Sequence, residues 1–451
     1  MGGWVVRGVL IAGVIAFVVS PQVVLAQEVQ NSEARARAFI ELMSGGQYAQ
    51  AFELFTPQMK AAMPLDRLAA TWNSLTAQAG PFQRQTIASV EPRGVLSVVV
   101  VTCAFERATF DMLVTVNPAN LVGGLGVRPA TQAVAYTPPA YANPAAYKEV
   151  EVTVGAGQWI LPATLTMPVA SGPVPAVVLV HGSGPGDRDA TVGQVKQFKD
   201  LALGLASRGI AVLRYDKRTR VHANLMQNVP RLTVKEESID DAIAAVQLLR
   251  STPSVDPNRI VVLGHSLGGM LVPRIAAAGP PVAGFIVMAG AARSMQQAVV
   301  EQARYLAQAD GTISADEQAQ ISQIQQVMAR IDALGPADAS NPERLFGAPA
   351  SYWLDLRGYD PPAAAVQVKQ PMLVLQGERD YQVTLEEFAR WKAALANRTD
   401  VTFHSYASLN HLFVAGTGRS TPAEYNTPGH VSEAVIQDVA AWIKTLAPLI
   451  R

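Results

Sequence analysis

Five short, continuously apolar runs between residues 176 and 375 constrain the fold most. Each is four or five residues long, and helical stretches separate them. They occupy residues 176–180, 210–213, 260–263, 285–288 and 372–375. A strand that is apolar on both faces must be covered on both faces, which is typical of parallel strands in α/β proteins. The sequence therefore predicts a mostly parallel sheet with helices on both faces, within residues 148–451.

A long connection separates the fourth run from the fifth. Residues 293–358 exceed the few residues of an ordinary connection. Ser314 and Glu317 have the spacing of a capping box, which predicts the start of a helix. The apolar residues that follow lie on one helical face: Ile321, Ile324, Met328, Ile331 and Leu334. This helical insertion is either a solvated hairpin or a cap over a site.

The first part of the mature chain has a different pattern. Residues 32–79 fit three short helices, and β-branched runs at 97–101 and 112–116 fit strands. Helices followed by strands predict a small α+β domain over residues 32–118. Residues 128–147 are rich in Pro and Ala without an apolar period, which predicts a linker.

Residues 1–26 have the pattern of a secretory signal. Arg7 supplies the positive charge, residues 8–19 are apolar, and Pro21 precedes a small-residue cleavage site that ends at Ala26. We expect cleavage after Ala26 and export of the mature protein, to the periplasm or the medium, without a membrane attachment. The alternative is an uncleaved N-terminal anchor, because the apolar run extends through Leu25 and approaches the length that spans a bilayer.

The charge balance and the cysteine count exclude several classes of function. Lys plus Arg equals Asp plus Glu, 36 each, so no overall field attracts nucleic acid or another polyanion. The single cysteine, Cys103, lies in an apolar run, so we expect no internal disulfide and a buried, inert thiol. No group of His, Cys or carboxylate residues has the spacing of metal ligands, so we expect neither a metal nor another cofactor.

Residues 264–268, Gly-His-Ser-Leu-Gly, match the pattern G-x-S-x-G. The motif follows the apolar run 260–263 and opens a helical stretch, which is the context in which such a serine sits on a sharp turn. A serine hydroxyl is a weak nucleophile and needs a base, and the flanking glycines permit the turn. We therefore interpret Ser266 as the nucleophile of acyl transfer.

The acid and the base are expected further along the chain, in the order Ser, Asp, His. Asp380 follows the strand 372–376 and is the preferred acid, with Glu378 as its competitor. His411 follows the strand 401–406 and is the preferred base, with His430 as the alternative.

The loop that follows residues 176–180 is rich in glycine. Its start, His181-Gly182-Ser183-Gly184, has the position of the loop that supplies an oxyanion hole. The backbone N–H groups of Leu267 and Ser183 are the expected donors. A phosphate-binding loop is the rival interpretation, but no Gly-Lys-Ser/Thr follows. His181 is expected to be a structural hydrogen-bonding residue. The charged run 214–218 is either a substrate clamp or an internal ion-pair network, and the network is preferred.

Taken together, these segments resemble bacterial serine carboxylesterases of the α/β-hydrolase superfamily, particularly the EstD-type group, in which a small domain of unknown role precedes the hydrolase. The similarity covers nearly all of the mature chain. It includes residues 52–57, 181–189, 264–269, 352–356, 377–383 and 409–413. The resemblance implies the α/β-hydrolase fold, the triad Ser266, Asp380 and His411, and hydrolysis of small-molecule esters, with short acyl chains favoured.

Two other functions stay open at the level of the sequence. The same residues would serve a peptidase or amidase of this fold, because amide and ester hydrolysis share the acyl-enzyme route. A mainly ligand-binding exported protein is the third hypothesis, in which residues 32–118 carry the function. The sequence does not determine the oligomeric state.

Overall fold

The computed structural model describes residues 21–93, 96–130, 136–341 and 343–449. Two compact units divide the chain, residues 1–132 and 133–451. The predicted signal segment, residues 1–26, lies mostly outside the described residues, and Pro21 to Ala26 belong to the first described helix. Among the described residues, no helix combines the length and the apolarity that a bilayer crossing requires.

The first unit packs helices on an antiparallel sheet of strand order β1-β2-β3-β4. Its helices are α1 (Pro21–Ser44), α2 (Tyr48–Glu53), α3 (Pro57–Ala62) and α4 (Leu65–Ala79). Its strands are β1 (Phe82–Arg93), β2 (Leu96–Phe105), β3 (Thr109–Val116) and β4 (Val122–Pro129). The described part thus has four helices where the sequence predicted three; α3 was missed because it has no buried residue and hence no apolar period. Thr56 caps it, and Pro57 starts it.

Cys103 lies within the core of this unit. It is fully buried among the apolar residues of the sheet and its helices. Burial, together with the nearby Asp111, raises the pKa of the thiol to about 12, so it stays protonated at neutral pH. The expectation of a buried thiol is confirmed.

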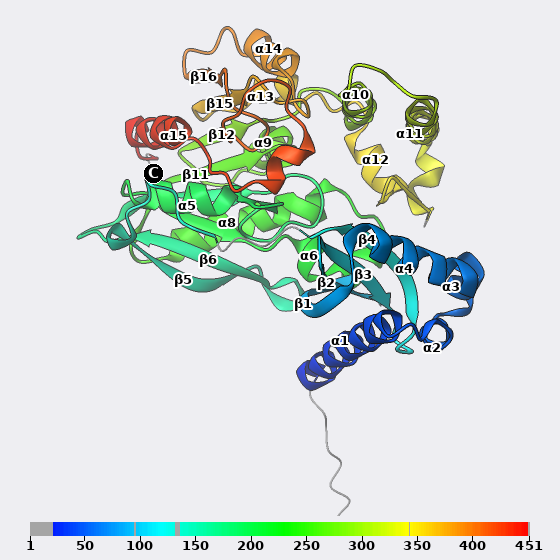
Figure 1. Ribbon diagram of the computed structural model, residues 1–451. Helices are drawn as coiled ribbons and strands as arrows, with labels where there is room; N and C mark the ends of the chain where they lie inside the picture. The colour runs from blue at the N-terminus through cyan, green and yellow to red at the C-terminus, as the bar shows by residue number, and fades with distance from the viewer. Residues whose placement is uncertain (1–20, 94–95, 131–135, 342, 450–451) are drawn as a thin grey trace, which may run out of the picture. The chain divides into compact units, whose positions relative to one another are not determined.

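An eight-stranded sheet forms the centre of the second unit, in the order β16-β15-β12-β11-β7-β10-β6-β5 (Figure 1). The strands are β5 (Tyr147–Val154), β6 (Leu161–Pro168), β7 (Val174–Val180), β10 (Ala211–Tyr215), β11 (Val255–His265), β12 (Gly284–Met288), β15 (Met372–Gly377) and β16 (Val401–Tyr406). In this order the strands from β16 to β10 are parallel, and β6 and β5 are antiparallel additions at one edge. The five apolar runs lie in five of the parallel strands, so the mostly parallel sheet is confirmed.

Two separate apolar clusters cover the two faces of this sheet. In β7, Val177 and Leu179 pack with α5 (Gln197–Ala206) and α15 (Glu433–Thr445), whereas Ala176 and Val178 pack with α8 (Asp240–Ser251) and α9 (Leu267–Ala277). Successive side chains of a strand point to opposite faces, so a strand covered on both sides must be apolar throughout. This explains the continuous runs in the sequence.

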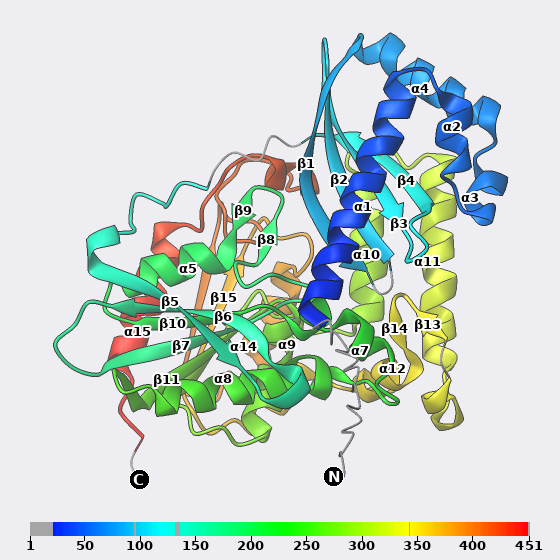
Figure 2. The ribbon, with the colours of Figure 1, turned by 90° about the horizontal axis from the view of Figure 1, so that it is seen from below.

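The remaining α-helices of the second unit and one π-helical turn lie in the connections between the strands. They are α6 (Arg218–Val221), α7 (Ala223–Gln227), the π-helical turn η3 (Lys235–Ile239), α10 (Met295–Ala307), α11 (Ala315–Ala333), α12 (Ala350–Leu356), α13 (Pro361–Ala365) and α14 (Leu385–Ala394). In the insertion 293–358, α10 and α11 lie side by side (Figure 2). Ser314 and Glu317 form the expected capping box at the start of α11.

Candidate active site

Ser266 occupies the turn between β11 and α9. Its backbone has φ +56° and ψ −118°, a conformation that side-chain-bearing residues rarely adopt. The Ser266 N–H donates to the Met288 carbonyl of β12 at 3.0 Å, and its carbonyl accepts from the Met270 N–H at 2.9 Å. These bonds hold the strained turn at the carboxyl end of the sheet, where sites of α/β proteins gather.

The glycines around Ser266 are required by close backbone approaches. A Cβ on Gly264 would lie 2.1 Å from the carbonyl oxygen of Gly268. A Cβ on Gly268 would lie 2.4 Å from the carbonyl oxygen of Val180. Both distances are far below van der Waals contact, so no larger residue fits, and the G-x-S-x-G pattern follows from the tightness of this turn.

Asp380 and His411 are in direct contact. His411 Nδ1 lies 2.7 Å from Asp380 Oδ2, and each residue is 4% exposed. Asp380 Oδ1 accepts the backbone N–H groups of Gln382 and Val383 at 2.8 and 3.0 Å, and Oδ2 also accepts from the Gln376 side chain at 3.3 Å. Because a carboxylate accepts from Nδ1–H, the lone pair of the His411 ring is left on Nε2.

The competing acid and base lie elsewhere. Glu378 is exposed and accepts the Ser405 hydroxyl at 2.8 Å. His430 pairs through Nδ1 with Asp200, at 3.1 Å. Within the described part of the chain, neither Glu378 nor His430 contacts His411. The structure therefore brings Asp380 to His411 and leaves both competitors apart.

A cavity of about 270 Å³ has two residues of the predicted triad in its wall. Ser266 and His411 both line it, together with residues 181–186 and Tyr425. No described residue hydrogen bonds with the Ser266 hydroxyl, so Ser266 and His411 are not hydrogen bonded to each other in this structure. A shared cavity wall at the end of the sheet is still the arrangement in which a substrate carbonyl meets both groups.

The glycine-rich loop passes directly over Ser266. A Cβ on Gly182 would lie 3.1 Å from Ser266 Cβ and 3.6 Å from Oγ. Ser183 follows Gly182 on the cavity wall, and Leu267 is the first residue of α9, where the helix presents unpaired N–H groups. Among the described residues, none accepts a hydrogen bond from the N–H of Ser183 or Leu267. Both predicted donors are thus beside the serine with no partner in the described part of the chain.

His181 opens this loop and has a structural contact. Its Nε2 lies 2.6 Å from the Tyr215 carbonyl oxygen, which can only accept, so Nε2 carries the proton. Burial lowers the pKa of His181 to about 4, so the ring is neutral at pH 7. The expectation of a structural hydrogen-bonding residue is confirmed.

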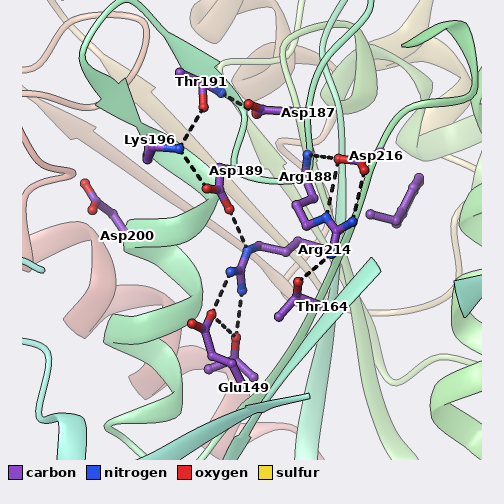
Figure 3. Close-up of polar contacts among 12 residues, drawn as sticks. Glu149, Thr164, Asp187, Arg188, Asp189, Thr191, Lys196, Asp200, Arg214 and Asp216 are labelled. Carbon is purple, nitrogen blue, oxygen red and sulfur yellow. Dashed lines mark hydrogen bonds and ion pairs between the residues drawn. The ribbon is translucent and has the colours of Figure 1, made fainter. Parts of the chain in front are cut away.

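Ion pairs fasten the far end of the loop to the sheet (Figure 3). The Arg214 guanidinium on β10 pairs with Asp189 at 3.1 Å and with Glu149 on β5 at 2.6 Å. Arg188 pairs with Asp216 at 3.1 Å. The cations at positions 217 and 218 also have buried carboxylate partners, so the predicted internal ion-pair network in the run 214–218 is confirmed.

Three positioning residues were missed at the level of the sequence. His265 donates from Nε2 to the His411 carbonyl at 3.0 Å, and burial keeps its pKa well below the usual range, so it is neutral. Gln376 supports Asp380, as described above. The Asn410 side chain accepts two backbone N–H groups of the turn that follows it, both at 3.1 Å. In the sequence, the only indication of a role for these three residues was that they lie near Ser266, Asp380 and His411 in the chain.

A second cavity, of about 590 Å³, adjoins the first, because Ser183, Gly184 and Pro185 line both. Its other walls are largely apolar and come mostly from the insertion and the elements beneath it: Met226, Leu232, Met295, Val299, Phe346, Ala348 and Trp353. Met328 and Ile331 of the insertion are buried in the same cluster as the sheet. The insertion is thus a cover over a cavity and not a solvated hairpin.

Comparison with known proteins agrees with this architecture. Residues 177–427 match the alpha/beta hydrolase family, and residues 36–125 match a family described as protein of unknown function, DUF3887. The chain is 37% identical to Esterase EstD of Thermotoga maritima over 413 residues, which are 91% of this chain and 95% of that protein. The predicted resemblance to the EstD-type group is confirmed.

Among solved structures, the chain is similar to a hyperthermophilic esterase from Pyrobaculum calidifontis, with 17% identity, a TM-score of 0.42, and coverage of 66% of this chain and 85% of that one. It is also similar to Est1E from Butyrivibrio proteoclasticus, with 15% identity, a TM-score of 0.42, and coverage of 65% and 99%. With the family match over residues 177–427 and the extended identity to the Thermotoga protein, the chain belongs to the alpha/beta hydrolase family.

Proposed function

We propose that this protein is a serine carboxylesterase that works through an acyl-enzyme. His411 takes the proton of the Ser266 hydroxyl through Nε2, and Ser266 Oγ attacks the carbonyl carbon of the ester. The alcohol leaves with that proton, and water then releases the acid from Ser266 by the reverse sequence. The observation that carries the proposal is the 2.7 Å contact of His411 with buried Asp380 on the wall of the cavity that Ser266 lines.

Asp380 has an orienting role in this proposal. Its bond to Nδ1 fixes the tautomer in which Nε2 is free to accept a proton, and its negative charge stabilises the imidazolium that follows. The Leu267 and Ser183 N–H groups are proposed as the oxyanion hole, since both lie beside Ser266 without a partner among the described residues.

Esters are the proposed substrates for three reasons. The Thermotoga relative is named an esterase, and the adjoining cavity has largely apolar walls that suit a hydrocarbon group better than a peptide. An alcohol also leaves more readily than an amine, so a site without a clamp for a peptide terminus favours esters. We propose a preference for short acyl chains, because the insertion covers this cavity.

A panel of p-nitrophenyl esters of increasing acyl length and of amino-acid p-nitroanilides tests the proposal. Wild type is expected to hydrolyse short esters, long esters less well, and the anilides little. Ser266→Ala is expected to lose at least about 10³-fold in kcat. Ser251→Ala, at an exposed serine on α8, serves as the matched control. Activity of Ser266→Ala near wild type would contradict the nucleophile, and efficient anilide cleavage would favour a peptidase.

Export is a separate part of the proposal. It rests on Arg7, the apolar residues 8–19 and the cleavage pattern that ends at Ala26. Mass spectrometry of the protein from the exporting cell is expected to find Gln27 as the first residue. Recovery of the uncleaved chain from the membrane fraction would favour the anchor.

A further inference from the structure

A buried lysine outside the triad contacts the loop over Ser266. Lys217 follows β10 and is 2% exposed. Its ammonium donates to the Gly182 carbonyl at 2.8 Å and to Glu237 Oε1 at 2.6 Å. Glu237 Oε2 accepts the Tyr352 hydroxyl at 2.7 Å. Burial and the adjacent Glu237 keep the pKa of Tyr352 well above its usual value, so this hydroxyl stays a donor.

Stability alone is a poor explanation for this buried pair. Removing a cation and a carboxylate from water is costly, and apolar replacements of buried ion pairs are often neutral or stabilising. Glu237 also lies in the π-helical turn η3, a rare geometry that recurs at functional sites. The pair contacts the loop at the active site through the hydrogen bond from Lys217 to the Gly182 carbonyl.

That one backbone bond acts on a specific donor. The Gly182 carbonyl and the Ser183 N–H belong to the same peptide group, and the described chain contains no cis peptide. In a planar trans peptide the C=O and N–H point to opposite sides. A fixed Gly182 carbonyl therefore fixes the direction of the Ser183 N–H, away from Lys217. A cation on the carbonyl also polarises the peptide and makes its N–H a stronger donor.

We infer that Lys217 is a positioning residue for the oxyanion hole: through the Gly182 carbonyl it orients and strengthens the Ser183 N–H, and Glu237 and Tyr352 hold its ammonium in place. The inference rests on the proposed function, because it assigns Ser183 to the oxyanion hole. Tyr352 lies on α12 of the insertion, so the cover over the larger cavity takes part in holding the oxyanion donor.

The double variant Lys217→Met/Glu237→Gln tests the inference. It removes both charges together, so no unpaired ion is left buried, and the amide oxygen introduced at position 237 can still accept from Tyr352. We expect kcat for a short ester to fall about 10- to 100-fold with KM within about twofold, which is less than the loss of a whole oxyanion donor. Affinity for phenylboronic acid, which forms a tetrahedral adduct with a serine, is expected to fall by a similar factor.

A neighbouring buried ion pair supplies the matched control. The side chains of Arg218 and Asp241 are 8% and 1% exposed. Like Lys217 and Glu237, they join the segment after β10 to the segment of η3 and α8. Neither side chain hydrogen bonds with residues 182–186. Arg218→Met/Asp241→Asn removes the same charges at a similar depth. We expect it to keep kcat and boronate affinity, whatever its effect on the melting temperature.

The outcomes separate this inference from the proposed function. Unchanged kcat and boronate affinity in the Lys217 double variant, with Ser266→Ala inactive, would overturn the inference and leave the esterase proposal standing. Equal losses in both double variants would also overturn it, because they would reflect a general loss of structure. If the Lys217 double variant does not fold, Tyr352→Phe decides: a smaller fall in kcat and boronate affinity supports the inference, and no change overturns it.

Discussion

The Asp380 carboxylate on one side of the cavity at Ser266 and the backbone of the glycine-rich loop on the other are held in different ways. On the side of the base, the oxygens of Asp380 are bonded by two backbone N–H groups, the Gln376 amide and His411. On the side of the glycine-rich loop, ion pairs hold the backbone, such as Arg214 with Asp189 and the buried lysine pair described above. The difference matches the proposed chemistry, since the imidazole must gain and lose a proton while the loop only has to stay rigid.

The largest expected effect on kcat comes from a change at Asp380, on the side of the base. Asp380→Asn keeps the shape but removes the charge that favours the imidazolium, and its amide can stabilise the wrong tautomer of His411. We expect kcat to fall by about 10³- to 10⁴-fold. Glu378→Gln is the matched control and should change kcat little, because Glu378 contacts Ser405 and not His411. A large loss in Glu378→Gln with an active Asp380→Asn would reverse the assignment.

A smaller effect is expected from the support of the base. His265→Leu removes the donor to the His411 carbonyl and lets the loop of the base shift. Small displacements of catalytic groups cost up to about 100-fold in rate, so we expect a fall in kcat of about 10- to 100-fold. His404→Leu, at an exposed histidine of β16, is the control in the same assay. Equal kcat values for the two variants would contradict a positioning role for His265.

A third expected effect concerns the loop side and appears in stability. The pKa of His181 is about 4 in the folded chain against 6.5 for the ordinary residue, so the unfolded chain binds more protons between these values. The contribution is complete above about pH 6.5 and is lost as the pH falls toward about 4, amounting to roughly 3 kcal/mol.

Urea unfolding of wild type and His181→Gln at pH 7 and pH 5 measures this contribution. The difference in unfolding free energy between the two proteins is expected to be smaller at pH 5 than at pH 7. A difference that is the same at both values would show that His181 is not held neutral by burial.

Much of the fold was predictable because its cause is local. Strands covered on both faces must be apolar throughout, so β7, β10, β11, β12 and β15 were visible as continuous runs. The glycines next to Ser266 were visible because the turn excludes a Cβ. Helix α3 was not, since it has only six residues and none of them is fully buried, so it leaves no apolar period.

The candidate site was predictable where chain order carries information. Asp380 and His411 follow successive parallel strands, whose carboxyl ends meet at one edge of the sheet, and the structure brings them to 2.7 Å. Lys217, Glu237 and Tyr352 come from three separate segments, and only the packed chain brings them together. No pattern of spacing predicts such a contact, because tertiary packing decides it.

Trapping of the acyl-enzyme tests the central claim most directly. A slowly released p-nitrophenyl ester is mixed with wild type, Ser266→Ala and Ser251→Ala, and the quenched proteins are digested and weighed by mass spectrometry. The account predicts that one acyl group is added to the peptide that contains Ser266 in wild type and in Ser251→Ala, and that Ser266→Ala carries none. An acyl group on another residue that turns over at the rate of hydrolysis, or full activity of Ser266→Ala, would contradict it.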